Sequence, residues 1–455
     1  MVRPDGFEPP TPCSEDKCSN PLSYGRVITY FTPDKTILPE YNSQAMTKIT
    51  NFQEANAALT GFVLPDKETD YTLKRTIELM DYLHNPQNKL RVIHVAGTSG
   101  KTSTCYYIAA MLNESGYKVG LTVSPHVDEI NERVQVNMVP LVESEYCKQL
   151  TNFLGIVEKS GIKPSYFEIL IAFGYWQFAK QKVDYAVIEV GMGGLLDGTN
   201  VVSRPDKICV ITDIGLDHTN ILGKDLKSIA MQKAGIILPS NHVFIHPQDR
   251  QIMEVVRLAC KENNAKLQIV PDAGSPPSLP LFQQRNWSLA RAVAEHIAGP
   301  LKPAVVDAST KTIVPARMEI IEHQGKTIVF DGSHNQQKLQ ALEQSLKKKF
   351  PNQPIAALIS FGQNKESIVI NSLDAITDVT THIIFTKFRI GQDEYRTAIN
   401  PKTLENLCKA RGFRDTNVET DPVLAFKQLL KRPEQVLLVT GSFYLLNHVR
   451  PLILK

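Results

Sequence analysis

Short apolar runs alternate with helical stretches along most of this chain. Residues 90–97 (LRVIHVAG) predict a buried strand, because the run is short, almost wholly apolar and leads into a glycine-rich turn. Residues 102–116 predict the following helix, which Gly116 closes, and residues 118–124 predict a second strand. Strand, helix and strand in this order indicate a parallel unit. Further strand-like runs occupy residues 185–191, 207–215 and 242–247.

A second series of strand-like runs occupies the C-terminal part of the chain. Helical stretches separate its four runs, which are residues 327–333, 354–362, 381–388 and 435–442. Residues 299–312 are proline-rich at their start and weakly patterned, so we expect a linker there. The prediction is an α/β protein with a large P-loop-type, mainly parallel domain over residues 46–298 and a smaller Rossmann-like α/β domain over residues 313–455.

The first 45 residues do not share this pattern. Seven of the 28 prolines lie between Pro4 and Pro39, and few residues there are able to build a core. The segment lacks the basic start and apolar centre of a secretion signal. We interpret residues 1–45 as a disordered extension, or as the product of a start site placed too far upstream. Cys13 and Cys18 have no second Cys/His pair nearby, which favours two exposed thiols over a metal site.

Composition and charge argue against several classes of protein. Hydrophobic residues make up 42% and charged residues 21%, which excludes a mostly disordered chain. The formal net charge of +3 gives no support for a nucleic acid or a membrane surface as partner. No apolar run reaches the roughly 18 residues of a transmembrane helix. Buried thiols of a cytoplasmic protein are predicted for five of the seven scattered cysteines: Cys105, Cys147, Cys209, Cys260 and Cys408.

The strongest local signal lies between the first predicted strand and its helix, in Gly97-Thr98-Ser99-Gly100-Lys101-Thr102-Ser103. Glycines let the chain curl so that backbone N–H groups face an anionic phosphate. The helix N-terminus and Lys101 add favourable charge, and the Thr102 hydroxyl can approach a phosphate-bound Mg²⁺. Val95 stands where the full phosphate-loop pattern has glycine, so an ordinary tight turn is the alternative. The strand–turn–helix setting favours nucleotide binding.

Polar residues at the ends of other predicted strands suggest a metal. Ser124, Glu189 and His218 each follow or end a separate strand. The C-terminal ends of parallel strands lie along one edge of a sheet, so these side chains can meet near the phosphates and hold Mg²⁺. Taken singly, such residues are typical of solvated or hydrogen-bonded loops. Only their shared position at strand ends favours a metal site.

The sequences of several motifs, and their order along the chain, are more specific for a protein family than any single residue. Along residues 48–455 the chain contains VIHVAGTSGKTST, TVSPHVDEINERVQVN, FEIL, IEVGMGGLLDGTN, ITDIGLDHTNILG, KAGI, ARME, DGSHN and VTGSFYLL. Together these segments resemble folylpolyglutamate synthase and the related dihydrofolate synthase, which belong to the Mur ligase superfamily of ATP-dependent amide-bond-forming enzymes. The resemblance implies ATP bound between two domains that close around it.

The resemblance also implies a reaction and its substrates. A carboxylate of the substrate attacks the γ-phosphorus of ATP and gives an acyl phosphate and ADP. The amine of L-glutamate then attacks the acyl carbon and phosphate leaves. The expected partners are ATP, L-glutamate and a folate or dihydropteroate, with two Mg²⁺ ions, and the expected enzyme is monomeric. Positive charge on Lys101 and on the Mg²⁺ ions stabilises the approach of the two anions.

Individual residues are carried over from the family's motifs. The segment from Gly97 to Ser103 matches the phosphate loop, and Ser124, Glu189 and His218 match metal ligands. Lys233 matches a lysine that is carbamylated in these enzymes and helps to hold a second Mg²⁺; sequence alone favours a solvated helix residue. Nucleotide contacts are matched by Asn286, Arg317, Asp331 and His334. The pterin side is matched by Tyr166, Phe167 and Glu168, of which Phe167 fits a helix core equally well. Catalytic roles are expected for Lys101, His218, Lys233 and His334.

At four motif positions this chain has a residue other than the one usual in the family. Ser99 stands for the common Asn, Leu195 for Arg and Ala316 for Gly. Thr102 stands where this branch has Gly and where the peptidoglycan-building Mur ligases often have Thr. A Mur-type ligase acting on a UDP-muramoyl substrate therefore stays as an alternative, although only about 90 residues precede the loop, too few for its additional domain. A nucleotide-binding regulator without catalysis is a further alternative.

Overall fold

The computed structural model describes residues 48–62, 72–272, 274–363, 373–392 and 394–454. The N-terminal extension predicted for residues 1–45, including Cys13 and Cys18, lies outside the described residues. Within the described ranges, no helix is both long enough and apolar enough to cross a lipid bilayer. The five cysteines predicted to be buried thiols are buried and unpaired, so that prediction is confirmed.

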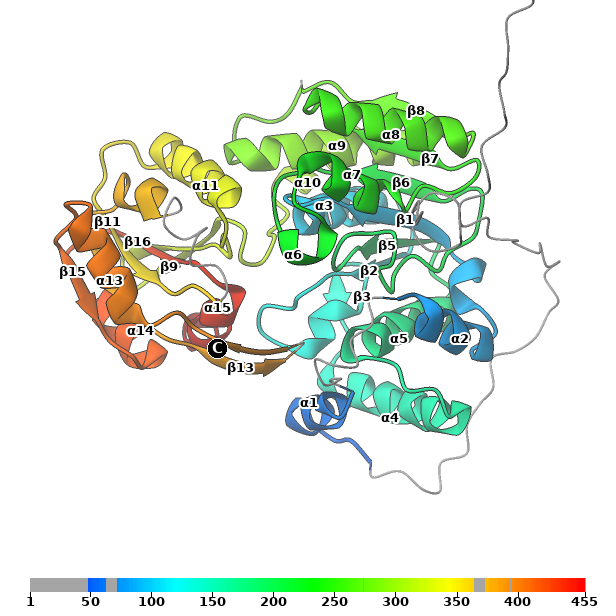
Figure 1. Ribbon diagram of the computed structural model, residues 1–455, viewed down its shortest axis with the longest axis horizontal. Helices are drawn as coiled ribbons and strands as arrows, with labels where there is room; N and C mark the ends of the chain where they lie inside the picture. The colour runs from blue at the N-terminus through cyan, green and yellow to red at the C-terminus, as the bar shows by residue number, and fades with distance from the viewer. Residues whose placement is uncertain (1–47, 63–71, 273, 364–372, 393, 455) are drawn as a thin grey trace, which may run out of the picture. The chain divides into compact units, whose positions relative to one another are not determined.

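The first sheet has eight strands in the order β4-β3-β2-β5-β1-β6-β7-β8 (Figure 1). The strands from β2 to β8 in this order pair in parallel, and β3 and β4 form an antiparallel edge. Their bounds are β1 Arg91–Ala96, β2 Val119–Thr122, β3 Gln135–Val136, β4 Val139–Pro140, β5 Tyr185–Glu189, β6 Ile208–Ile211, β7 His242–Ile245 and β8 Lys266–Ile269.

Helices cover both faces of this sheet, which explains its nearly continuous apolar runs. Side chains alternate along a strand, so Ile93 and Val95 of β1 pack in one core with α3 and α9, whereas Val92 packs in another with α4 and α5. The helices are α1 Phe52–Thr60, α2 Lys74–Tyr82, η1 Pro86–Lys89, α3 Lys101–Glu114, η2 Ile130–Arg133, α4 Glu143–Ser160, α5 Tyr166–Gln181, α6 Thr219–Leu222, α7 Leu226–Ala234, α8 Arg250–Glu262, α9 Leu281–Ala298 and α10 Pro303–Thr310.

The second sheet has six strands in the order β15-β12-β11-β16-β10-β9, with only β9 antiparallel to its neighbour. A separate antiparallel pair is formed by β13 and β14. The strands are β9 Glu319–His323, β10 Lys326–Phe330, β11 Ile355–Ile359, β12 His382–Phe385, β13 Arg389–Gln392, β14 Glu394–Thr397, β15 Thr416–Val418 and β16 Val436–Thr440. The accompanying helices are α11 Gln336–Lys349, α13 Pro401–Ala410, α14 Pro422–Leu430, α15 Phe443–Val449 and α16 Pro451–Leu454.

Two mainly parallel α/β sheets confirm the predicted fold class. The sequence pattern missed edge strands such as β8 and β9, in which exposed residues alternate with partly or fully buried ones and which therefore form no apolar run. The segment predicted as a linker, residues 299–312, contains helix α10, whose Val305 packs into the core around α3. The domain boundaries placed at residues 298 and 313 stay a prediction.

Candidate active site

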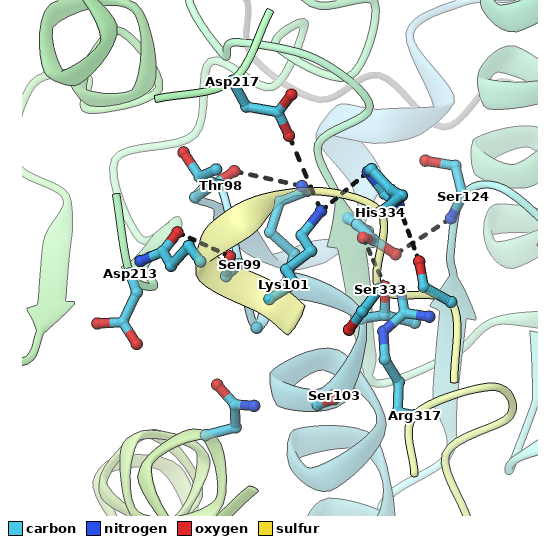
Figure 2. Close-up of a pocket in the computed structure, with 18 of the residues that line it drawn as sticks. Thr98, Ser99, Lys101, Ser103, Ser124, Asp213, Asp217, Arg317, Ser333 and His334 are labelled. Atoms are coloured by element: carbon cyan, nitrogen blue, oxygen red, sulfur yellow. Dashed lines mark hydrogen bonds and ion pairs between the residues drawn. The ribbon is translucent and has the colours of Figure 1, made fainter. Parts of the chain in front are cut away.

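A cavity of about 1210 Å³, including space open to solvent, lies at the carboxyl edge of the first sheet. The loops after β1, β2, β5 and β6 line it, and so do the turn before β9 and the loop after β10. Figure 2 shows that Lys101, Ser124, Asp217, Arg317 and His334 come from different segments and converge on this space. Ligands of open α/β sheets bind at this edge, so the cavity has the position of a substrate site.

The loop between β1 and α3 is shaped by two glycines. Gly97 and Gly100 have positive φ angles of 156° and 89°. A Cβ atom would lie 1.8 Å from Thr212 Oγ1 at Gly97, and 2.2 Å from Asn286 Oδ1 at Gly100. Neither position therefore accepts a side chain without displacing a neighbour. Helix α3 begins directly after the loop with no side-chain cap, so its first N–H groups point at the cavity edge where an anion is favoured.

Two lysines meet at the backbone of this loop. Lys101 Nζ donates to the Gly97 carbonyl at 3.2 Å, and Lys233 Nζ donates to the same oxygen at 2.9 Å. Lys233 is only 3% exposed, so the alternative of a solvated helix residue is wrong. Burial, assisted by the positive charge of Lys101, lowers the pKa of Lys233 to about 7.

A buried carboxylate joins two of the predicted polar residues. Glu189 at the end of β5 accepts a hydrogen bond from Thr102 Oγ1 at 2.9 Å and one from the Ser124 N–H at 3.1 Å. Burial raises the pKa of Glu189, whereas the positive charge of Lys101 lowers it. The carboxylate and hydroxyl oxygens gathered here are the hard donors that Mg²⁺ prefers.

His218 lines the same cavity from the N-cap of α6, where its φ angle is 50°. Its side chain is 36% exposed, and its Nε2 lies 4.0 Å from Asp217 Oδ1. Among the described residues, no group of three or more His, Cys, Asp or Glu side chains has the arrangement of a metal site. The structure therefore brings Ser124, Glu189 and His218 to one cavity without grouping them as a ready-made set of ligands.

The second sheet contributes Arg317 and Asp331. Arg317 Nη2 donates to Thr102 Oγ1 at 2.9 Å, and its guanidinium carbon lies 4.2 Å from the centre of the Phe443 ring. Burial lowers the pKa of Arg317, and the carboxylate of Asp331 opposes that change. Asp331 accepts hydrogen bonds from the N–H groups of Met318 and Ser333 at 2.7 and 2.8 Å, and burial raises its pKa. Asp331 thus fixes two backbone turns beside the cavity.

Several cavity residues were not found by sequence reasoning. Lys338 Nζ lies 3.2 Å from His334 Nε2 and 3.8 Å from Asp217 Oδ2, and Asn335 Nδ2 donates to the same carboxylate oxygen at 3.1 Å. Ser99 Oγ donates to Gln337 Oε1 at 3.1 Å. The missed residues are close in sequence to predicted ones: Asp217 precedes His218, and Lys338 lies four residues after His334.

The residues predicted for the pterin side, Tyr166, Phe167 and Glu168, do not line this cavity. Glu168 caps helix α5 and pairs with Arg75 at 3.0 Å, and Tyr166 is buried. The Phe167 ring packs against Gly191, where a Cβ atom would lie 2.4 Å from it; Gly191 borders the cavity. Their assignment to a folate stays a prediction.

The chain resembles known proteins over nearly its whole described length. Residues 95–275 match the Mur ligase middle domain, and residues 316–443 match the Mur ligase glutamate ligase domain. Dihydrofolate synthase/folylpolyglutamate synthase of Bacillus subtilis is 29% identical over 83% of this chain and 94% of its own length. Folylpolyglutamate synthase of Lacticaseibacillus casei is 30% identical over 89% of this chain and 99% of its own length. The structure of E. coli FolC in complex with DHPP and ADP superposes with a TM-score of 0.76 and 25% identity, covering 90% of this chain and 99% of that one.

Proposed function

This chain belongs to the folylpolyglutamate synthase and dihydrofolate synthase family of Mur ligases, and from that premise we propose how its cavity joins L-glutamate to a folate. The chain is an ATP-dependent ligase that forms an amide bond. Its matches include enzymes whose structures contain ADP, which supports ATP as the nucleotide. The acceptor in our proposal is the γ-carboxylate of a folate, with dihydropteroate as a second acceptor.

The main support for assigning these residues to a nucleotide site is that Thr102 forms hydrogen bonds with both sides of the cavity. Its hydroxyl donates to Glu189 of the first sheet at 2.9 Å and accepts from Arg317 of the second sheet at 2.9 Å. Thr102 directly follows Lys101 at the start of α3, where phosphates are favoured. A nucleotide whose phosphates lie on this loop is then within reach of cations from both sheets.

The reaction that we propose has two steps. An oxygen of the folate carboxylate attacks the γ-phosphorus of ATP, the bond to the β-phosphate oxygen breaks, and an acyl phosphate and ADP result. The glutamate amine then attacks the acyl carbon and loses a proton, and inorganic phosphate leaves with the oxygen that joined it to the acyl group. Lys101 and Arg317 stabilise the negative charge that accumulates as the two anions approach. Arg317 comes from the second sheet, so closure of the cavity completes the site and excludes water.

We propose that Mg²⁺ binds at Glu189, Ser124 and His218, with the Thr102 hydroxyl beside it. The oxygen donors at Thr102, Ser124 and Glu189 fit this hard cation. When bound, the ion neutralises phosphate charge and orients the triphosphate. Glu189 already accepts hydrogen bonds from the Thr102 hydroxyl and from the backbone N–H of Ser124, which keeps these two segments beside the site.

We further propose that Lys233 is the lysine that becomes carbamylated. Only a neutral amine attacks CO₂, and burial lowers the pKa of Lys233 to about 7, so a large fraction is neutral at physiological pH. The product carries carboxylate-like oxygens in place of a cation, next to the phosphate loop. Intact-mass spectrometry of native protein at neutral pH, with the K233R variant as control, tests this modification: we expect a gain of one CO₂ that is absent from K233R.

The function is tested with a panel of acceptors. Purified protein is incubated with ATP, Mg²⁺ and glutamate, and ADP release is measured with a folate, with dihydropteroate, with a UDP-muramoyl acceptor, or with none. We expect ADP release that requires glutamate and a folate or dihydropteroate, and a product heavier by one glutamate residue. ADP release that requires the UDP-muramoyl acceptor would overturn the folate assignment, and ADP binding without any acceptor-dependent release would favour a regulator.

A further inference from the structure

A second contact between the two sheets lies behind the turn that carries Arg317. Arg450 follows helix α15, and its guanidinium binds two carboxylates. Its Nε and Nη2 atoms donate to Glu319 at 2.7 and 2.6 Å, and its Nη1 donates to Asp128. Glu319 is the first residue of β9 in the second sheet, whereas Asp128 lies in the loop after β2 of the first sheet. Arg450 therefore bridges the two sheets.

The three charged groups of this bridge are largely withdrawn from water. The side chains of Arg450, Glu319 and Asp128 are 9%, 6% and 21% exposed. Removing one member of a buried ion pair is strongly destabilising, because the remaining charge is left without a partner. Asn447 adds to the same contact by donating to the backbone oxygens of Val127 and Asp128 at 2.8 and 3.1 Å. The bridge is thus a fixed structural point and not a surface ion pair.

Glu319 also holds the backbone next to Arg317. Ala316 and Met318 have φ angles of 57° and 49°, in the left-handed region that residues with side chains rarely occupy. The Ala316 N–H donates to Glu319 Oε2 at 3.0 Å, and the Met318 N–H donates to Asp331 Oδ2 at 2.7 Å. Strained backbone of this kind persists only where its surroundings determine it. Arg317 therefore stands between two strained residues, each bound by a buried carboxylate.

The contacts continue from this turn to the cavity and back to the bridge. Arg317 reaches Thr102, Thr102 reaches Glu189, and Glu189 accepts a hydrogen bond from the N–H of Ser124. Ser124 and Asp128 belong to the same loop after β2. The two contacts between the sheets, one at Thr102 and one at Asp128, therefore belong to one connected network of hydrogen bonds and ion pairs.

We propose that Arg450 is a positioning residue that acts through Glu319 to fix the turn presenting Arg317 to the nucleotide. This inference rests on the proposed function, which gives Arg317 a nucleotide contact. Arg450 itself is not among the residues that line the cavity. Without it, the buried Glu319 carboxylate loses its cation and is no longer a fixed acceptor for the Ala316 N–H. The turn then relaxes, and Arg317 moves away from Thr102.

A double-mutant cycle on ADP affinity tests this inference. The dissociation constant of ADP is measured by calorimetry for the full chain and for the variants R317M, R450M and R317M/R450M. We expect R317M and R450M each to weaken ADP binding by about tenfold. Because both changes act through one guanidinium, we expect the double variant to bind no more than twofold more weakly than R317M alone.

Matched variants separate positioning from general destabilisation. R432M removes another arginine of the second-sheet region, which pairs with Glu434 at 2.8 Å and does not line the cavity. We expect R432M to bind ADP like the unmodified chain even if its melting temperature falls. The variant R450K keeps a positive charge but lacks the planar fork that binds both oxygens of Glu319, so it provides the test if R450M does not fold. We expect R450K to weaken ADP binding less than R450M does, and again not in the R317M background.

The outcomes distinguish the inference from the function on which it rests. If R317M weakens ADP binding but R450M and R450K do not, the positioning role is wrong and the proposed function stands. If the losses of R317M and R450M multiply in the double variant, Arg450 acts independently of Arg317 and the inference is also wrong. If R317M binds ADP with unchanged affinity, Arg317 does not contact the part of the nucleotide that ADP retains, and the inference, which needs that contact, is wrong.

Discussion

On the first-sheet side of the cavity the backbone curls at Gly97 and Gly100, whereas on the second-sheet side it curls at Ala316 and Met318. Both segments have positive φ angles, and each is followed or interrupted by a cation that faces the cavity. Glycine adopts this conformation without strain, so the first loop is specified by its own sequence. The second turn uses residues with side chains and depends on carboxylates that come from elsewhere in the chain.

One cation site is therefore encoded by local sequence and the other by contacts between distant parts of the chain. Lys101 follows its loop directly and starts a helix, so a short motif is enough to place it. Arg317 needs Glu319 and Asp331 to hold its neighbours, and its own hydrogen bond to Thr102 crosses from one sheet to the other. Damage to the first site should therefore be caused by local changes, and damage to the second by changes remote from the cavity.

The largest effect is expected at the locally encoded cation. Replacing Lys101 with Met removes the positive charge at the start of α3 and should lower the rate of ADP release by about 10³-fold. Lys101 is partly exposed, so the fold should be retained. The K348M variant, which removes an exposed lysine of α11, is the control and should keep full activity. Activity of K101M within tenfold of the unmodified enzyme would contradict the role of this loop.

A glycine variant tests the claim that the first loop is specified by its backbone. A Cβ atom at Gly100 would lie 2.2 Å from the buried Asn286 amide, so G100A should weaken ADP binding by more than about tenfold and lower stability by about 1–3 kcal/mol. Gly116 has a similar φ angle, 94° against 89°, but open space around its Cβ position. G116A should therefore lose about 1 kcal/mol of stability and no ADP affinity. Equal loss of ADP affinity in both variants would show that strain alone, and not the collision, is responsible.

The buried lysine beside the loop predicts a pH dependence of stability. Burial lowers the pKa of Lys233 from 10.5 to about 7, so between these values the unfolded chain binds more protons than the folded one. The free energy of unfolding therefore rises with pH across this window and falls as pH drops toward 7. In CO₂-free buffer, the unmodified chain should gain about 2 kcal/mol relative to K233M between pH 7 and pH 9, measured by denaturant unfolding. Parallel curves for the two proteins would mean that Lys233 keeps its ordinary pKa.

The smallest effect is expected where the second turn already tolerates a side chain. Replacing Ala316 with Gly relieves the strain at φ 57°, but it also removes a buried methyl group and makes the unfolded chain more flexible. These contributions oppose each other, so stability should change by less than about 1 kcal/mol and ADP affinity should stay the same. A large loss of either quantity in A316G would mean that the Ala316 side chain, and not the carboxylate contacts, holds the turn.

The sequence predicted the fold class and the first-sheet side of the site because both depend on local patterns. The buried strand β1 appears in the sequence as an apolar run, and the loop after it ends in a glycine followed by a lysine. The family resemblance added Arg317 and Asp331, but neither the resemblance nor the pattern indicated Arg450 or Lys338. Contacts between residues far apart in the chain leave no periodic signal, and the helical pattern at Phe167 fitted both a core and a ligand position.

Transfer of oxygen from the acceptor carboxylate to phosphate shows directly whether ATP held between the two sheets activates that carboxylate. The acceptor folate is labelled with ¹⁸O in both oxygens of its γ-carboxylate, and the enzyme turns it over with ATP, Mg²⁺ and glutamate. We expect each inorganic phosphate released to carry one ¹⁸O atom and the amide product to keep the other. Product formation accompanied by phosphate without ¹⁸O would contradict an acyl phosphate intermediate and activation of the carboxylate by ATP.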